Sequence, residues 1–254
     1  MRKFAALAGV AVVASAGIAG AATINDTTLA SPPGVYFGSG NINSHFSVTT
    51  ENGIEIGQQA LQRFVGPVTP TGNLYTVNTG ATTVLGKTGS WWGFAFSVNL
   101  GITGLHLSDV SATLTMTDAV NGTTGSFNLQ LIPDNAGYNG STFNAAFLNA
   151  ATDIAFQNSE ALSFASIAGA LNDPGYDINA NNTYTFTLDV DRIVCPVGAV
   201  GCDLNLAQNT IVVQAGTGAP LPEPSQIGLG IWLIGSIALF VGTRKRRPLL
   251  LRRG

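Results

Sequence analysis

Hydrophobic and polar residues alternate with a period of two through most of the middle of the chain. In the stretch 110–117, for example, the even-numbered residues are Val, Ala, Leu and Met, whereas the odd-numbered ones are Ser or Thr. This alternation is typical of β-strands that have one buried face and one solvated face, as in antiparallel sheets. The same pattern predicts strands at 42–48, 92–98, 126–131, 183–190 and 211–214.

Turn signals separate these stretches, and none of them alternates with a helical pattern. The turns are predicted at Asn52-Gly53, Gly72-Asn73, Asn121-Gly122 and Asn139-Gly140. Short strands at this spacing predict an all-β fold, an antiparallel two-layer β-sandwich over residues 23–218. The alanine-rich stretch 143–171 does not fit the alternation, and it is expected to hold one or two short helices or loops at a sheet edge.

The N-terminus, residues 1–22, has the three parts of a secretion signal. Arg2 and Lys3 precede an apolar stretch at 4–16, and Ala19-Gly20-Ala21 fits the small-x-small pattern of a cleavage site. Cleavage is expected after Ala21 or Ala22, which implies signal peptidase and the secretion machinery as partners. A retained membrane anchor and a buried helix are the alternatives, but the glycines of this segment make a long helix unfavourable.

The C-terminus has a different order of features. A proline-rich segment is followed by an apolar run at 227–242 and then by Arg244, Lys245, Arg246 and Arg247. As a helix, the 16 residues of that run would be about 24 Å long, enough for a thin or locally thinned bilayer. The basic cluster would keep residues 249–254 in the cytoplasm, so the body would lie outside the inner membrane. The alternative is a core helix of a soluble domain.

Residues 219–248 resemble the PEP-CTERM sorting signal. The resemblance rests on Pro222, Glu223 and Pro224, followed by the apolar run and the basic cluster. It implies recognition by an exosortase, a membrane enzyme that removes the helix and the basic tail. One departure is the extra segment from Pro248 to Gly254. Both prolines also favour an extended backbone, the conformation that a protease needs.

Two alternatives to that signal are open. A sortase signal would require Leu-Pro-x-Thr-Gly, and here Leu221 and Pro222 match whereas Pro224-Ser225 stand where Thr-Gly should be. An uncleaved single-pass anchor is the other alternative. The body is also similar to some proteins that carry the sorting signal, in a pattern without an attached activity at 52–57, 63–64, 74–76, 92–98 and 173–188.

Charge excludes one class of partner. Between Thr23 and Pro220 there are 3 basic residues and 13 acidic ones, so the net charge is 3 − 13 = −10. Such a body repels nucleic acid. With 45% hydrophobic and only 10% charged residues, the chain also does not have the composition of a disordered protein.

Catalytic and metal-binding motifs are scarce in the sequence. The chain contains 2 histidines, His45 and His106, and neither belongs to a cluster with metal-ligand spacing. His45 is expected at an outward strand position. A G-x-S-x-G nucleophile motif is absent, and no motif selects a pair of carboxylates, so neither an enzyme nor a cofactor is predicted.

Two small features remain. Asp173, Asp177, Asn179 and Asn181 are weak Ca²⁺ candidates, because Asn182 and Leu188 stand where a Ca²⁺ loop requires Gly and Glu. A solvated acidic turn without metal is the preferred interpretation. Cys195 and Cys202 flank six residues that include Pro and Gly, and in an exported chain they are expected to form a structural disulfide.

Together these features predict an exported cell-surface or matrix protein of structural or adhesive function. Its Thr/Ser/Asn-covered face would interact with exopolysaccharide. The alternatives are a secreted carbohydrate- or Ca²⁺-binding module, with exposed aromatics such as Trp91 stacking on sugars, and a secreted hydrolase with a pair of acids.

Overall fold

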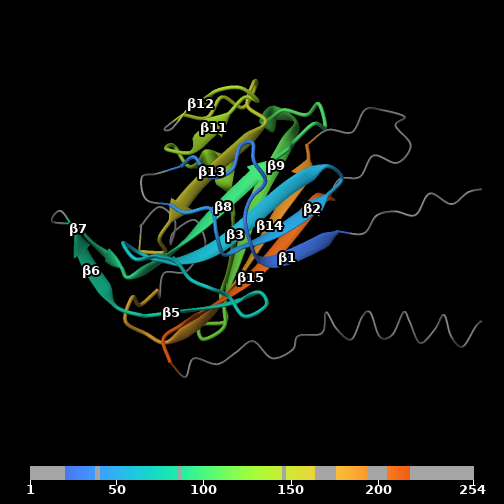
Figure 1. The fold of residues 1–254 in the computed structure, drawn as a ribbon. Coiled ribbons are helices and arrows are strands. Elements are labelled where there is room, and N and C mark those ends of the chain that lie inside the picture. Colours follow the sequence, from blue (N-terminus) through green and yellow to red (C-terminus); the bar gives the residue numbers. More distant parts are fainter. Residues whose placement is uncertain are drawn as a thin grey trace, which may run out of the picture.

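The computed structural model describes residues 21–37, 41–84, 87–144, 147–163, 176–193 and 205–217. These residues form an all-β fold, as predicted, with two single-turn 3₁₀-helices, η1 (Leu107–Asp109) and η2 (Leu129–Leu131), and no α-helix (Figure 1). Within this part of the chain, no helix has the length and hydrophobicity needed to cross a membrane. The predicted apolar runs of both termini lie outside it.

The first sheet contains eight strands, and all of its pairs are antiparallel. Short β4 (Gly66–Pro67) pairs with β3 (Ile54–Gln62), outside the main strand order. In spatial order the others are β1 (Ala22–Thr27), β2 (Phe46–Glu51), β3 (Ile54–Gln62), β8 (Trp92–Asn99), β13 (Ala155–Glu160), β11 (Ala136–Tyr138) and β12 (Phe143–Asn144).

The second sheet contains five strands. Its edge strand β5 (Leu74–Val77) runs parallel to β15 (Asn205–Ala215), so the expectation of purely antiparallel sheets is wrong at this edge. No hairpin joins these two strands, which are far apart in the sequence, and their relative direction is therefore free. The spatial order of the second sheet is β10 (Thr124–Asn128), β9 (Val110–Asp118), β14 (Asn182–Arg192), β15 (Asn205–Ala215) and β5 (Leu74–Val77).

A separate hairpin of β6 (Ala81–Val84) and β7 (Lys87–Ser90) projects from the body (Figure 1).

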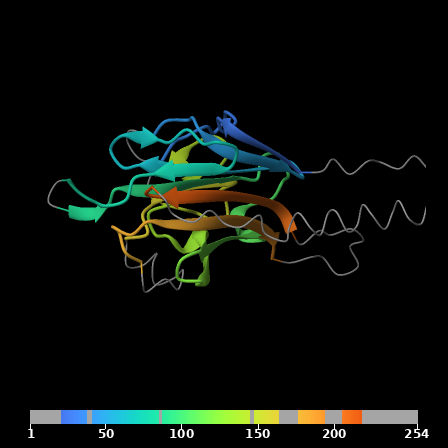
Figure 2. The same ribbon diagram turned by 90° about the horizontal axis from the view of Figure 1, so that it is seen from below.

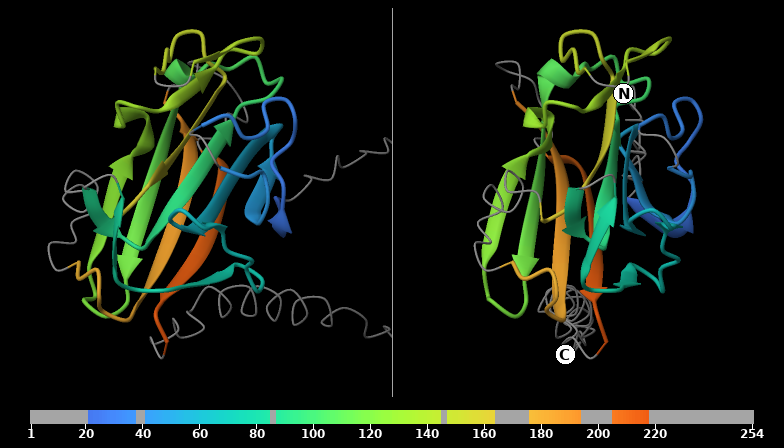
Figure 3. Two further views of the ribbon diagram at one scale, coloured as in Figure 1. Left: turned by 60° about the vertical axis from the view of Figure 1, so that its left-hand side comes forward. Right: turned by 90° about the vertical axis from the view of Figure 1, so that its left-hand side faces the viewer.

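The two large sheets lie face to face, and their facing apolar side chains form one core (Figures 2 and 3). Phe94 of β8 stacks on Phe186 of β14 with 5.1 Å between ring centroids, and Trp92 lies 5.5 Å from Tyr184. The inward faces predicted for 110–117 and 183–190 are confirmed, because their apolar residues are buried in this core.

A segment at 28–37, here called the N-terminal strap, covers part of the outer face of the first sheet. Leu29 packs on Phe46 and Val48, over the space that Gly57 leaves open, because a Cβ at Gly57 would lie 2.5 Å from Leu29 Cδ2. Further along the strap, Phe37 packs on the outer side of β8 and β11. All eight residues of β8 are therefore buried, and the solvated face predicted for 92–98 does not exist.

Gln157 of β13 fastens the strap to the sheet through both ends of its amide. Its Nε2 donates to Gly34 O at 2.6 Å and to Ser97 Oγ at 3.0 Å, while its Oε1 accepts from Tyr36 N at 3.1 Å. The side chain and Gly34 are both buried. This polar contact fixes the path of a segment that has no strand partners of its own.

Three sequence predictions fail in detail. The strand predicted at 42–48 begins only at Phe46, and Ile42 is 55% exposed. Its polar residue Ser47 faces the second sheet and accepts from Asn209 Nδ2 at 3.3 Å, since the strap has taken the opposite side. The strand predicted at 126–131 ends at Asn128, and Leu131, in η2, is 70% exposed.

The third failure is the alanine-rich stretch 143–171. Its described part contains β12 and β13 instead of helices, and β13 lies inside the first sheet between β8 and β11. Both faces of β13 are covered, one by the core at Phe156 and one by the strap at Gln157. Such a strand does not need to alternate, which is why the period-two criterion missed it.

Candidate binding face

The outer face of the second sheet carries polar side chains on four adjacent strands. It arises directly from the alternation, because each inward apolar residue of β9 and β14 places a Thr, Ser or Asp outward. We call this surface the hydroxyl face. It consists of Ser111, Thr113, Thr115, Thr117, Thr124, Ser126, Asn128, Thr185, Thr187, Asp189, Asp191, Gln208 and Thr210.

Strand register arranges these side chains in rows. Thr115 of β9 and Thr187 of β14 lie directly opposite each other. The row extends from Thr115 to β10 on one side and from Thr187 to β15 on the other. The Thr115 hydroxyl lies 2.9 Å from Ser126 Oγ, and the Thr187 hydroxyl lies 3.1 Å from Thr210 Oγ1. Neighbours along a row are about 4.8 Å apart, and successive rows about 7 Å apart, as the sheet geometry dictates. The result is a grid of short hydroxyl-bearing side chains on β9, β10 and β14, which continues on β15 only at Thr210, because Gln208 and Val212 occupy the adjacent outward positions of that strand.

One end of the grid is acidic. Asp189 accepts a hydrogen bond from Gln208 Nε2 at 2.6 Å, and Asp191 follows on the same side of β14. Partial burial, and secondly the carboxylate of Asp189, raise the pKa of Asp191 above its usual value. Two neighbouring carboxylates repel each other, and they also repel a further anion. This end of the hydroxyl face therefore favours partners with hydroxyl or cationic groups over anionic partners.

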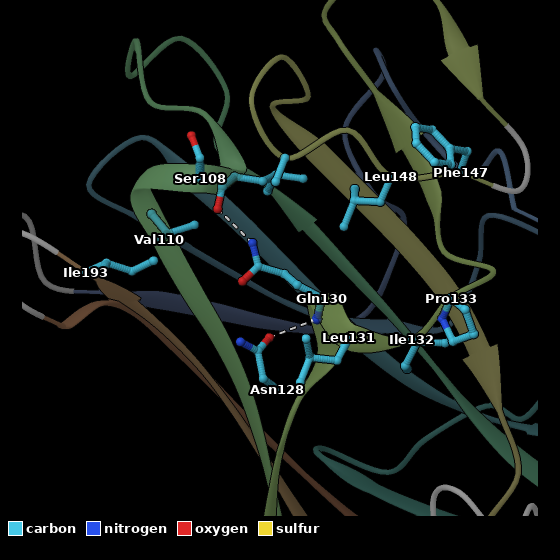
Figure 4. A pocket seen from close by; sticks show the side chains of 12 residues that line it. Ser108, Val110, Asn128, Gln130, Leu131, Ile132, Pro133, Phe147, Leu148 and Ile193 are labelled. Carbon is cyan, nitrogen blue, oxygen red and sulfur yellow. Dashed lines mark hydrogen bonds between the residues drawn. The ribbon is translucent and has the colours of Figure 1, made fainter.

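A pocket of about 530 Å³ lies beside this end of the grid, where β10 turns into η2 (Figure 4). Most of the residues that line it are apolar. Two of these side chains, Phe147 and Ile193, are 59% and 58% exposed. The polar groups in the lining are Ser108, Asn128 and Gln130. Asn128 belongs to both surfaces, because it ends the outward row of β10 opposite Thr113.

Two hydrogen bonds fix the amides of this pocket. Asn128 Oδ1 accepts from Gln130 N at 2.9 Å and thereby caps η2. Gln130 Nε2 donates to Leu107 O at 2.7 Å, which ties η2 to η1. Each amide uses one of its two polar ends in this way. Asn128 Nδ2 and Gln130 Oε1 remain without a partner among the described residues and point to the same side of the pocket (Figure 4).

The Ca²⁺ candidates that can be placed do not converge. Asp177 Oδ1 accepts from Asn179 N at 2.9 Å within a turn, and Asn181 Nδ2 donates to Thr217 O at 2.6 Å. Asp173 lies outside the described residues. In the part of the chain that the structure describes, no three His, Cys, Asp or Glu side chains are grouped as metal ligands.

Most residues of the predicted terminal signals lie outside the described residues. Ala21 and Ala22 are exceptions: both are exposed, and β1 begins at Ala22, which pairs with Thr50. Cleavage after Ala21 would thus leave β1 whole. The other signal residues, which remain predictions, are Ala19, Pro222, Glu223, Pro224, Arg244, Lys245, Arg246 and Arg247. The disulfide predicted between Cys195 and Cys202 of the body also lies outside the described residues and remains a prediction.

Two surface expectations are corrected. His45 does not occupy an outward strand position: it precedes β2 with a φ of 62°, and its Nδ1 lies 2.6 Å from Asp26 Oδ1. Trp91 is half-buried rather than exposed, and its carbonyl accepts from Arg63 N at 2.8 Å. The aromatic that is free to contact a ligand beside the hydroxyl face is Phe147, which no sequence pattern singled out.

One carboxyl is buried. Glu160 at the end of β13 is 8% exposed, and burial, with a smaller contribution from Asp134, raises its pKa to about 7. Asp134 itself is exposed and accepts from Asn158 Nδ2 at 3.1 Å. The two carboxyls therefore differ in environment, and it is burial that brings the pKa of Glu160 to about 7.

No protein-family model and no curated protein sequence matches this chain. Its function is therefore inferred from the residues and their placement.

Proposed function

We propose that the protein is an exported cell-surface or matrix component whose body, residues 23–218, is a two-layer β-sandwich that binds exopolysaccharide through the hydroxyl face. In this proposal the secretion signal delivers the body across the inner membrane. An exosortase then recognises Pro222, Glu223 and Pro224 and removes the apolar run and the basic cluster. The mature protein has a structural or adhesive function, not a catalytic one.

The observation that carries this proposal is the set of hydroxyl rows on β9, β10 and β14, which Thr210 extends onto β15. A sugar polymer presents hydroxyls that both donate and accept, and Thr and Ser side chains do the same. A single such hydrogen bond contributes little, about 0.5–1.5 kcal/mol, so useful affinity requires many of them in register. A grid that repeats along a sheet meets that requirement for a polymer that repeats along its own length.

Charge supports the same class of partner. The body has a net charge of 3 − 13 = −10 between Thr23 and Pro220, which disfavours nucleic acid and strongly anionic surfaces. A neutral polysaccharide is not repelled. The sorting part of the proposal rests on the two terminal signals in the sequence, and the exposed Ala21 just before β1 is compatible with cleavage there.

The test replaces hydroxyls by methyl groups without changing side-chain shape. The double variant Thr115→Val, Thr187→Val removes the centre of one row, and we expect it to lower retention of the full chain on exopolysaccharide purified from the producing cells. The matched control is Thr83→Val, Thr88→Val, which removes an exposed hydroxyl pair 2.7 Å apart on the β6–β7 hairpin. Equal retention of both double variants and the unchanged protein would contradict the proposal.

A further inference from the structure

Three Asn-Gly pairs occur in the chain, at 52–53, 121–122 and 139–140. In each pair both residues are exposed and lie in a connection between two strands. The backbone nitrogen that follows an asparagine can attack its side-chain carbonyl carbon, and glycine favours this reaction because it has no Cβ to hinder the approach. The hydrogen bonds around the three pairs differ, so the pairs are not expected to react alike.

The side-chain oxygen of Asn139 accepts four hydrogen bonds at the turn between β11 and β12. It accepts from N and Oγ of Ser141 at 3.1 Å and 3.0 Å, and from N and Oγ1 of Thr142 at 2.9 Å and 3.0 Å. Because Oδ1 reaches forward to these two residues, the side chain folds over the intervening Gly140. Neither Asn139 Nδ2 nor Gly140 N has a hydrogen-bond partner in the part of the chain that the structure describes.

The pair at 121–122 has nearly the same local sequence, Asn-Gly-Thr-Thr instead of Asn-Gly-Ser-Thr, but the opposite arrangement. Asn121 Nδ2 donates to Asp118 Oδ2 at 2.9 Å, and Gly122 N donates to Asp118 O at 3.0 Å. No donor to Asn121 Oδ1 is found among the described residues. Here the leaving nitrogen and the attacking nitrogen are both held, and the carbonyl is not polarised by a neighbour.

At the third pair, Asn52 Nδ2 donates to Leu206 O at 2.9 Å, so the leaving nitrogen is again held. Its Oδ1 likewise has no donor among the residues that the structure describes. Of the three pairs, the one at 139–140 therefore alone combines a polarised carbonyl with a free leaving group and a free attacking nitrogen.

We propose that Asn139 is a deamidation site that its own turn activates, with water as the co-reactant. Gly140 N loses its proton to hydroxide and forms a bond to Asn139 Cγ, and the four donors stabilise the negative charge that develops on Oδ1. The Cγ–Nδ2 bond then breaks, and Nδ2 takes up a proton and leaves as ammonia. Water opens the five-membered ring at Cγ, which gives aspartate, or at the main-chain carbonyl carbon, which gives isoaspartate. In sum one water is consumed and one ammonia released, without oxidation or reduction.

The two products affect the turn differently. Aspartate keeps an oxygen at the position to which the four donors point, and its charge strengthens those hydrogen bonds. Isoaspartate lengthens the backbone by one carbon, which opposes the bond from Asn139 N to Thr142 O at 3.3 Å and the pairing of Tyr138 with Phe143. The edge of the first sheet thus changes as the protein ages. This inference goes beyond the proposed function and does not depend on it.

The test follows all three pairs in one sample. The full chain, reconstituted in lipid nanodiscs, is incubated in mildly alkaline buffer, and conversion of each asparagine to an acid is measured over time by peptide mass spectrometry. Hydrogen bonds to a developing oxyanion are about twice as strong as those to a neutral amide, so we expect conversion at Asn139 to be about ten-fold faster than at Asn121 or Asn52. Equal rates at Asn139 and Asn121 would overturn the proposal, because exposure and local sequence are alike.

A variant separates activation by the donors from simple mobility of the turn. Ser141→Ala with Thr142→Val removes the two hydroxyl donors but keeps the backbone donors, and we expect it to slow conversion at Asn139 about five-fold. The matched control Thr123→Val removes the corresponding hydroxyl after the pair at 121–122. It should leave the rate at Asn121 unchanged, because no hydroxyl of the described residues reaches that Oδ1.

The opposite result is also informative. If Ser141→Ala with Thr142→Val leaves the rate at Asn139 unchanged or raises it, while the other two pairs react as before, the four bonds only restrain the side chain and the proposal is refuted. Faster conversion at all three pairs would show that this variant has lost its fold. Thr142→Val alone then replaces it, and the same criterion applies.

Discussion

Replacing Gln157 by Leu is expected to release the N-terminal strap. The change keeps a side chain of similar size but removes the two bonds that reach the strap, to Gly34 O at 2.6 Å and from Tyr36 N at 3.1 Å. Gly34 is a buried residue of the strap, so its carbonyl cannot turn to water unless the strap moves.

The magnitude follows from the groups left without partners. A buried donor or acceptor without a partner costs about 1–3 kcal/mol, and here one backbone carbonyl and one backbone N–H are affected. The Ser97 hydroxyl also loses its bond to Nε2, but it can rotate. Part of the cost is offset because Leu is cheaper to bury than an amide. We therefore expect the free energy of unfolding to fall by about 2–4 kcal/mol.

Urea denaturation followed by circular dichroism measures this loss. Hydrogen exchange of the amides at 28–37 shows independently whether the strap has opened, because its protection should fall more than that of β9 or β14. The control Gln208→Leu makes the same chemical change at an exposed position with one side-chain bond, to Asp189, and should cost less than about 1 kcal/mol. A loss below about 0.5 kcal/mol in Gln157→Leu, with strap exchange unchanged, would refute the role assigned to Gln157.

Two further predictions concern Glu160 and the sorting signal. Because burial raises the pKa of Glu160 from 4.5 to about 7 in the folded state, the fold binds this proton more tightly than the unfolded chain does. The contribution of Glu160 to stability is therefore fully present below pH 4.5 and is lost between pH 4.5 and 7, by up to about 3 kcal/mol. Glu160→Gln should remove this decrease and be more stable than the unchanged protein at pH 8 in urea titrations; a variant that is less stable at pH 8 would contradict the burial argument. Glu223→Ala with Pro224→Ala should leave export intact and accumulate a membrane-bound precursor, whereas trimming to the wild-type mature mass in a mass spectrum would favour a plain anchor.

Sequence periodicity predicted the second sheet far better than the first. The strands β9 and β14 have one core face and one solvated face, so their alternation reports burial directly. In the first sheet the strap covers the outer side, and burial on both faces removes the signal, as in β13. The strap itself has no periodicity, because it is held by Gln157 and by contacts of Leu29 and Phe37 that only the folded chain brings together.

The candidate site likewise has one part that the sequence predicted, the hydroxyl grid, and one part that it did not, the pocket. The part of the hydroxyl grid on β9 and β14 was predictable as a polar face, because it follows from the period of two, whereas Thr124, Gln208 and Thr210 lie outside the strands predicted at 126–131 and 211–214. The pocket was not, since continuing the alternation through 126–131 treated Gln130 as one more outward strand residue. The chain instead tightens into η2 after Asn128, whose side chain caps that turn. An Asn followed by a 3₁₀-turn is a local event that a strand pattern does not report.

The position of β15 decides how the body carries mechanical load. This strand is the last described one before the C-terminal segment, and it lies inside the second sheet, paired with β14 from Asn182↔Ala215 to Asp191↔Asn205 and with β5 on its other side. Tension applied at Ala215 along the strand loads all these hydrogen bonds at once, in shear. At the other end of the chain, β1 is an edge strand with a single neighbour, β2, and an interrupted register. A pull across that edge would open its bonds one after another. For the same direction of pull, β15 is therefore held by the bonds of two neighbours, and β1 by those of one.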